Sequence, residues 1–230
     1  LPFAIDAKEG DMTLADFVSA GIRVLDSENG FFMMCEGGKI DWSCHANDAA
    51  TSVREVLAFA DAVQVAVDFA NAHPGETLIV VTADHETGGM SVGYAATAYE
   101  TDLALLERQK VSYSLFKDIA AGMLEDNPEL TLDGMIPVIG QYFGLYPKSA
   151  ASKAKSKALV LSGREYGLIE DRIQLRVPGL PCFILPVGSR RQSRGPNGSG
   201  NTRCCELSTV DSHTLHPWNE VVRHWETRRR

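Results

Sequence analysis

Two short segments of the chain combine carboxylate and imidazole side chains at spacings that suit metal binding. In the first segment Asp41 precedes His45 by four residues, so that both lie on one face of a helical turn. In the second segment Asp84 and His85 are adjacent and follow an apolar run. Glu36 adds a third carboxylate. Mixed oxygen and imidazole ligands suit Zn²⁺ or a similar transition ion, whereas an oxygen-only group such as Glu36 suits Mg²⁺.

Each of these features also has a plainer interpretation. The spacing of Asp41 and His45 is common on helices, an aspartate after a strand often caps a helix, and Glu36 can be a solvated loop carboxylate. The combination favours a metal site, because several carboxylates at one place repel one another unless cations neutralise them.

The elements that position these side chains follow from the apolar pattern. Residues 30–35 and 77–82 are short continuous apolar runs, typical of parallel strands buried on both faces. Between them we predict a polar turn over 37–48 and a long helix over 48–72. A strand–helix–strand unit favours a parallel pair, and ligands bind outside the carboxyl ends of such strands. We therefore expect the five candidate ligands to converge at one rim of a sheet.

Further helices are predicted on both sides of this unit. Helical apolar spacing indicates a helix over 13–26, one or two helices within 101–125, and helices over 132–143 and 164–175. Residues 148–157 form a connector rich in Ala, Ser and Lys. The expected fold class is α/β, with a mostly parallel sheet.

The composition is that of an ordinary globular protein, but its character changes toward the carboxyl end. No apolar run approaches the roughly 20 residues that span a bilayer. The net charge of −8 argues against nonspecific nucleic-acid binding, which needs clustered Lys and Arg. Residues 1–160 hold 8 Lys, 3 Arg and 23 acidic residues, whereas residues 161–230 hold no Lys, 11 Arg and 7 acidic residues. Such a switch predicts a boundary.

The chain ends and the cysteines add two expectations. The opening residues Leu1-Pro2-Phe3-Ala4 include neither an initiator Met nor a signal-peptide pattern, so we expect the chain to begin inside a longer protein. The cysteines form no CxxC pair and predict no disulfide framework or Cys-type zinc finger; they are Cys35, Cys44, Cys182, Cys204 and Cys205.

Two long motifs carry a resemblance to a known family. The stretches GFFMMCEGGKIDWSCHAND (residues 30–48) and TLIVVTADHETGG (residues 77–89) closely resemble the two metal-ligand segments of alkaline phosphatases. They occur in the family's order and are separated by the expected helix. The resemblance also covers the opening 26 residues and continues, more loosely, to about Asp171. It implies a three-layer α/β/α sandwich, of which this chain holds an incomplete part.

The resemblance implies a role for each candidate ligand. Glu36 would bind Mg²⁺, Asp41 and His45 would bind a first zinc, and Asp84 and His85 would bind a second zinc. The implied reaction is hydrolysis of phosphate monoesters through a phosphoserine intermediate, with the metal ions assisting in-line displacement.

Other implications of the resemblance concern one residue within the first motif and residues outside both motifs. Trp42 matches a position near the phosphate pocket in some members, and His213, in Ser212-His213-Thr214, is a candidate further ligand of the first zinc. The family's serine nucleophile matches nothing in this chain and lies upstream of it. We therefore expect the chain alone to be inactive. The family further implies phosphate monoester substrates, a homodimer, and a periplasmic or secreted location.

The sequence therefore divides into two segments and is compatible with three functions. Residues 1–171 are the expected carboxyl-terminal part of a catalytic domain, and residues 172–230 form an atypical Arg-rich tail that is either disordered or translated out of frame. The alternatives to a phosphatase are a sulfatase- or phosphodiesterase-type metallohydrolase of the same superfamily, and a truncated product that binds metal without turnover.

Overall fold

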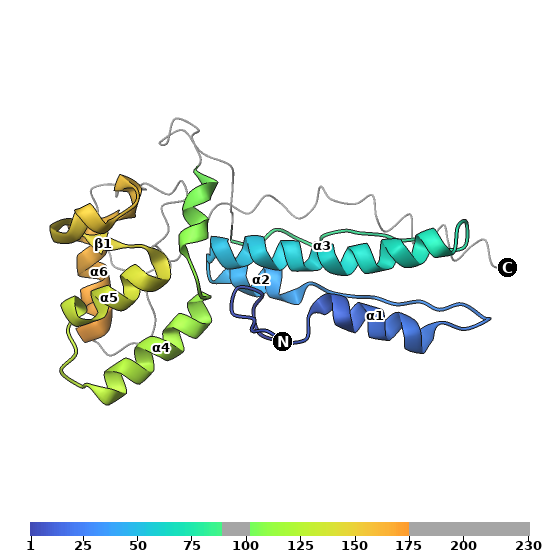
Figure 1. Cartoon of the computed structure of the whole chain (residues 1–230), viewed down its shortest axis with the longest axis horizontal. Helices are drawn as coiled ribbons and strands as arrows, with labels where there is room; N and C mark the ends of the chain where they lie inside the picture. The colour runs from blue at the N-terminus through green and yellow to red at the C-terminus, as the bar shows by residue number, and fades with distance from the viewer. Residues whose placement is uncertain (89–101, 175–230) are drawn as a thin grey trace, which may run out of the picture. The chain divides into compact units, whose positions relative to one another are not determined.

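The computed structural model describes residues 1–88 and 102–174, which are mainly helical (Figure 1). The α-helices are α1 (Leu14–Leu25), α2 (Gly38–His45), α3 (Ala49–Ala72), α4 (Tyr113–Asp126), α5 (Leu132–Phe143) and α6 (Gly163–Gln174). Short 3₁₀ turns are η2 (Leu103–Arg108), η3 (Lys148–Lys153) and η4 (Lys157–Leu159). The strands β1 (Tyr146–Pro147) and β2 (Val160–Leu161) pair in parallel, with Tyr146 opposite Val160.

Side-chain caps fix where the two amino-terminal long helices begin. At the start of α1, Thr13 accepts a hydrogen bond from the Asp16 N–H while the Asp16 carboxylate accepts from the Thr13 N–H, which is a capping box. At the start of α3, the Asp48 carboxylate accepts from the Thr51 N–H at 3.2 Å. Both helices predicted from the apolar spacing are therefore confirmed, with bounds within a residue or two.

The prediction of paired parallel strands at 30–35 and 77–82 is wrong for this structure. Both segments are extended, but the sheet formed by the described residues contains β1 and β2 alone. A strand exists only where a neighbour pairs with its backbone, and the described residues offer these two segments none. The described residues likewise do not form the three-layer sandwich.

The segment predicted as a polar turn is instead the short helix α2. It begins at Gly38 and ends at His45, and the Ala46 N–H then bonds back to the carbonyl of Trp42. Gly, Asp, His and Asn have low helix propensity, which indicates a turn, but tertiary contacts override this local preference. Here α2 packs against α3, and the buried Ser43 hydroxyl donates to the carbonyl of Ile40.

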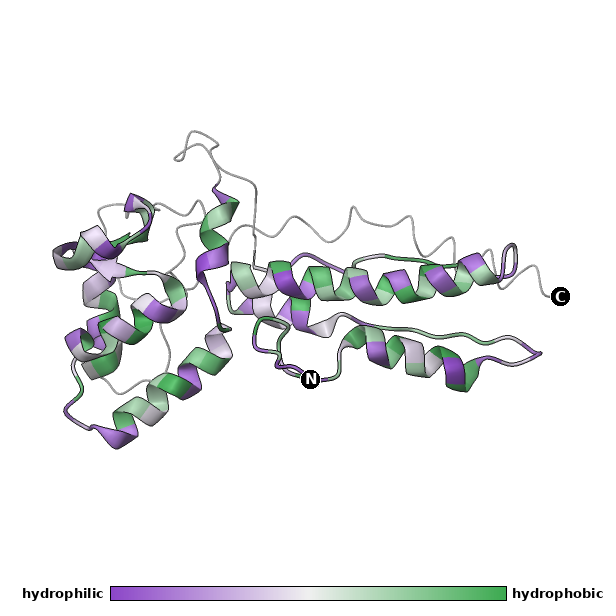
Figure 2. Cartoon of the chain, in the orientation of Figure 1, coloured by the Kyte–Doolittle hydropathy of each residue, from purple (hydrophilic) through white to green (hydrophobic). Residues whose placement is uncertain are grey.

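Residues 1–88 bury few of their apolar side chains. Val18, Ala50 and Ala62 are the buried apolar residues there. Along α3 the apolar residues Val53, Val56 and Leu57 are exposed. Figure 2 shows apolar positions along α3 and in the extended segments. An exposed Leu or Phe side chain forgoes about 1.5–3 kcal/mol of burial energy. Among the described residues, this part of the chain therefore lacks the structure that would cover its apolar side chains.

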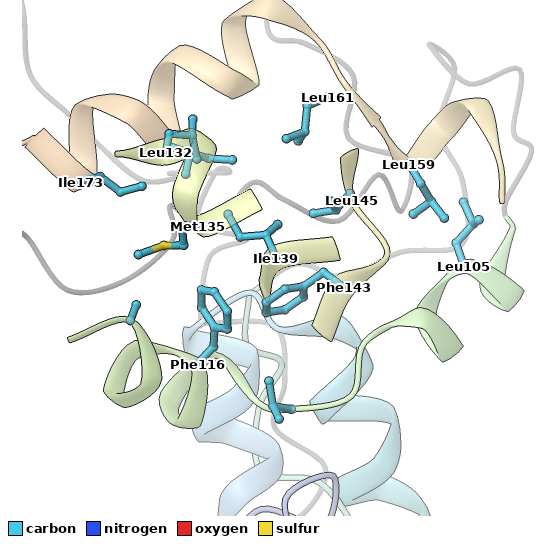
Figure 3. Packing of buried hydrophobic residues seen from close by; sticks show 13 residues of the cluster. Leu105, Phe116, Leu132, Met135, Ile139, Phe143, Leu145, Leu159, Leu161 and Ile173 are labelled. Atoms are coloured by element: carbon cyan, nitrogen blue, oxygen red, sulfur yellow. The ribbon is translucent and has the colours of Figure 1, made fainter. Parts of the chain in front are cut away.

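The hydrophobic core of the described chain lies within residues 105–173 (Figure 3). Phe116 of α4 is fully buried, and its ring meets that of Phe143 edge to face at 4.8 Å. Helix α5 crosses the core, continues through Pro137 and ends at Phe143; the next residue, Gly144, has a φ of 69°, which suits glycine. The cluster consists of Leu105, Val111, Phe116, Ala120, Leu132, Met135, Ile139, Phe143, Leu145, Leu159, Leu161, Ile169 and Ile173.

A tyrosine at the rim of this core gives a first testable prediction. The Tyr166 hydroxyl donates to Asp133 at 2.6 Å, and this bond raises the pKa of Tyr166 to about 12. Because the folded chain holds the phenol proton more tightly than the unfolded chain, this stabilisation is complete below pH ~10 and is lost as the pH rises through about 12. We expect Asp133→Asn to lower this pKa, measured by ultraviolet titration of tyrosinate. The exposed Asp118→Asn is the control and should leave the titration unchanged.

Candidate metal centre

Helix α2 brings the first carboxylate–imidazole pair together. The pair is four residues apart on one turn, with His45 Nε2 3.4 Å from Asp41 Oδ2. The helix is held by its packing against α3, and both side chains of the pair reach solvent. This arrangement leaves the imidazole and one carboxylate oxygen accessible to a cation.

The second pair lies in the loop that follows the second extended segment. His85 Nε2 is 3.5 Å from Asp84 Oδ2, while the other carboxylate oxygen accepts from the His85 N–H at 3.0 Å. The imidazole Nδ1 is 3.1 Å from the carbonyl of Glu86. An Nδ1–H that donates to this carbonyl leaves the Nε2 lone pair free, which is the tautomer of most histidine ligands.

A threonine hydroxyl connects the two pairs. Thr87 Oγ1 donates to Asp41 Oδ1 at 2.7 Å and lies 3.1 Å from His85 Nδ1. Because its own proton goes to Asp41, this hydroxyl shares the Nδ1–H of His85 with the Glu86 carbonyl as a second acceptor. The contact spans 46 residues and places the second pair beside the first. The same carboxylate therefore has one oxygen fixed by Thr87 and the other facing His45.

The local charges favour the protonated form of His85. The carbonyl of Glu86, the adjacent carboxylate of Asp84 and that of Asp41 together raise the pKa of His85. The carboxylates among these groups also attract a metal cation, which must displace the proton of the imidazolium in order to bind Nε2.

Glu36 does not lie close to either carboxylate–imidazole pair. Its carboxylate folds back beside Gly38, 3.4 Å from where a Cβ on that glycine would lie. Within residues 1–88 and 102–174, no group of three or more His, Cys, Asp or Glu side chains is gathered closely enough to hold one ion. The structure thus joins Asp41 to His45 and Asp84 to His85, and leaves Glu36 apart from them.

The donor types and spacings of each pair fit a zinc ligand shell. Two ligands at about 2.0–2.1 Å from a tetrahedral ion are about 3.3 Å apart. The separations of 3.4 Å and 3.5 Å in the two pairs are close to this value. Each pair therefore suits half of a tetrahedral shell, and the other ligands must come from outside the described residues. His213, predicted as one of them, lies outside those residues.

Trp42 lies beside a small cavity of about 230 Å³ and is itself exposed. Asp48 and Ser112 also line this cavity, and none of its lining residues is basic. Asp48 would repel a phosphate there. Within the described residues the cavity therefore does not support the role predicted for Trp42, which stays a prediction.

Thr87 is the site residue that the sequence reasoning missed. It belongs to the second motif, and the available signal was a hydroxyl two residues after His85. Because outer-sphere partners of ligands are worth about 10–100-fold in metal affinity, we expect Thr87→Val to weaken zinc binding about 10-fold. Thr87→Ser keeps the hydroxyl and should bind as the parent does. Isothermal titration with zinc measures both, and equal affinities for the two variants would contradict this role.

Gly88 allows the loop to approach the end of α2. Its φ is 75°, and a Cβ there would lie 2.4 Å from the carbonyl oxygen of Cys44. We expect Gly88→Ala to separate the loop from α2 and to change the amide resonances around Cys44. Gly75 is the matched control, because its φ is 81° and an added Cβ meets nothing within 4 Å. Gly75→Ala should cost only the ~1–2 kcal/mol of a left-handed residue, so Gly88→Ala must destabilise the chain more.

Comparison with known proteins identifies the family. The family model described as Alkaline phosphatase matches residues 1–131. The repressible alkaline phosphatase of Saccharomyces cerevisiae is 42% identical over 106 residues, which are 43% of this chain and 19% of that protein. Alkaline phosphatase 3 of Bacillus subtilis is 42% identical over 94 residues, 40% of this chain and 20% of that protein.

A solved structure agrees with these matches. The cold-active alkaline phosphatase of a psychrophilic Shewanella sp. superimposes with a TM-score of 0.58 at 27% identity, over 76% of this chain and 38% of that one. The class defined by these matches is that of phosphatases with an α/β fold. The chain belongs to the alkaline phosphatase family, and it spans about a fifth of the length of the curated relatives described above.

Proposed function

We propose that the chain contributes the two carboxylate–imidazole pairs of a phosphatase that hydrolyses phosphate monoesters. The observation that carries this proposal is the contact of Thr87 with both Asp41 and His85, which sets the pairs side by side. Asp41 and His45 would hold one zinc, Asp84 and His85 a second, and Glu36 a magnesium. When bound, such ions stabilise the attacking and leaving oxygens of a phosphoryl group.

The chain's own residues would bind the metal ions and orient the atoms that hold them. Asp41 presents one oxygen outward because Thr87 holds the other, and His85 keeps Nε2 free because its Nδ1 faces the Glu86 carbonyl. No side chain of this chain is assigned as the nucleophile. The serine that would form a phosphoserine belongs to the part of the fold that this chain does not contain, so the chain alone is expected to turn over no substrate.

The remaining parts of the proposal rest on the family. They are a homodimer, a periplasmic or secreted location, and a boundary near residue 171, which falls within α6. In residues 1–88 and 102–174, every helix falls short of the length and apolar character needed to cross a membrane. The tail beyond 174 lies outside the described residues.

A chimeric enzyme tests the proposed function. Residues 1–88 of this chain would replace their structural equivalents in the Shewanella enzyme. We expect the chimera to hydrolyse p-nitrophenyl phosphate and to prefer it to p-nitrophenyl sulfate. His85→Ala in the chimera should lower kcat/KM by about 10³-fold or more, as expected when a group that holds the reacting centre is removed. A folded, zinc-loaded chimera that hydrolyses no phosphate ester would contradict the proposal.

A further inference from the structure

Helix α2, which carries Asp41 and His45, depends on contacts with the rest of the chain for its position. It has eight residues, and its amino-terminal cap is Gly37, which has no side chain to accept from the free N–H groups. An isolated helix shorter than about 12 residues is only marginally stable in water, so other elements must hold α2. The element beside it is α3 (Figure 1).

Two buried serine hydroxyls connect α2 to α3. Ser43 is the buried residue of α2 and is 1% exposed, whereas the side chains of Asp41 and His45 are 36% and 71% exposed. At about 100° per residue, Ser43 lies about 200° around the helix from Asp41, on the side opposite the carboxylate–imidazole pair. Its Oγ accepts at 2.9 Å from the hydroxyl of Ser52 in α3, which is 2% exposed.

The hydrogen bonds of these two serines have a definite direction. Ser43 donates its proton to the carbonyl of Ile40 at 2.8 Å, so its Oγ acts as the acceptor toward Ser52. The Ser52 hydroxyl shares its proton between this Oγ and the Asp48 carbonyl, which is also 2.9 Å away. It accepts in turn from the thiol of Cys44 at 3.5 Å. The Ser52 hydroxyl therefore contacts two neighbouring side chains of α2.

Helix α3 does not need the Ser52 hydroxyl for its own hydrogen bonds. The Asp48 carbonyl already accepts from the Ser52 backbone N–H at 2.9 Å, which is the ordinary helical bond. Removing the hydroxyl leaves this bond in place but deprives the buried Oγ of Ser43 of its donor. A buried polar atom without a partner is costly, so α2 is the element that must move or fray in response.

We propose that Ser52 and Ser43 are positioning residues of the metal centre, because their hydroxyls hold α2 against α3 and so fix the ligand atoms of Asp41 and His45. This inference rests on the proposed function, since it concerns the zinc pair on α2. Neither serine contacts the ion. A metal site requires its ligands within about 0.5 Å of the productive geometry, so a helix that shifts or frays binds zinc less tightly.

Hydrogen exchange of the full chain in EDTA tests the anchoring of α2 without metal. In Ser52→Ala we expect the amides of residues 42–45 to exchange about 10-fold faster than in the parent, because α2 opens more often. Thr51→Val is the matched control. Thr51 is fully buried, and its hydroxyl donates to the Asp48 carboxylate at 2.7 Å within α3. This variant should leave exchange at residues 42–45 unchanged.

Zinc titration followed by the ring signals of His45 measures the effect on the metal pair itself. Outer-sphere partners that touch a ligand are worth about 10–100-fold in metal affinity, and an indirect partner is worth less. We therefore expect Ser52→Ala and Ser43→Ala each to weaken zinc binding about 5-fold, and Thr51→Val to bind within about 2-fold of the parent. Because the two serines share one hydrogen bond, the double variant should also lose about 5-fold, not the roughly 25-fold of independent effects.

Several outcomes would overturn the proposal. They are unchanged exchange at residues 42–45 in Ser52→Ala, faster exchange without a loss of zinc affinity, losses that multiply in the double variant, and an equal loss in Thr51→Val. The last two would indicate a general effect of stability. A parent chain whose His45 signals do not respond to zinc would overturn the proposed function and the positioning role together, while hydrogen exchange would still show whether the serines anchor α2.

Discussion

Replacing Asp48 by alanine should lower the free energy of unfolding by about 3–5 kcal/mol, because buried donors lose their acceptor. The Asp48 side chain is buried, and its two oxygens accept from the N–H and hydroxyl of Thr51 and from the Gln109 side-chain amide at 2.7 Å. Oδ2 also accepts from the Tyr113 N–H. One carboxylate thus caps α3 and also binds the segment that follows η2 to the start of this helix.

The size of this effect follows from burial. Gln109 is 1% exposed and Thr51 is fully buried, so water cannot replace the missing carboxylate. Urea unfolding of the full chain, followed by circular dichroism, measures the change. The control is Thr131→Ala, which removes the cap of α5 at an exposed position and should cost about 1 kcal/mol. Equal destabilisation by the two substitutions would show that Asp48 is only a helix cap.

Replacing Asp41 by alanine is expected to weaken zinc binding by on the order of 100-fold or more. The loss of a ligand must exceed that of an outer-sphere partner, which is worth about 10–100-fold. The substitution also removes the acceptor of the Thr87 hydroxyl, and with it a side-chain hydrogen bond between α2 and the loop of the second pair. Competition with a chromophoric chelator measures the affinity of the full chain for zinc.

The control for this substitution is another exposed aspartate on a helix. Asp61 lies on α3, and Asp61→Ala removes the same charge from the chain. If net charge alone attracted zinc, the two variants would lose affinity equally. We expect the Asp61 variant to bind within about 2-fold of the parent, because exposed charges beyond a Debye length contribute little.

Local features of the fold were predictable from the sequence where short-range forces decide them. Helices α1, α3 and α5 follow from apolar spacing and from caps such as Thr13, all of which act within a few residues. The i, i+4 relation of Asp41 and His45 was predictable for the same reason, although the helix that carries them was predicted as a turn.

Features that depend on distant chain segments were not predictable in the same way. Residues 30–35 and 77–82 have the composition of strands, but strand pairing needs a neighbour that the described residues do not include. The contact of Thr87 with Asp41 joins residues 46 apart and has no periodic signal. Asp48 was predicted only as the start of a helix, because its partner Gln109 lies 61 residues away.

Histidine resonances followed by NMR during zinc titration test the central claim most directly. His45 and His85 each lie in a carboxylate–imidazole pair, whereas His73 caps the end of α3 and its Nδ1 contacts the carbonyl of Phe69. We predict that the ring signals of His45 and His85 shift with zinc while those of His73 stay in place. Zinc that moves other imidazole signals and leaves His45 and His85 unchanged would contradict the assignment of this metal centre.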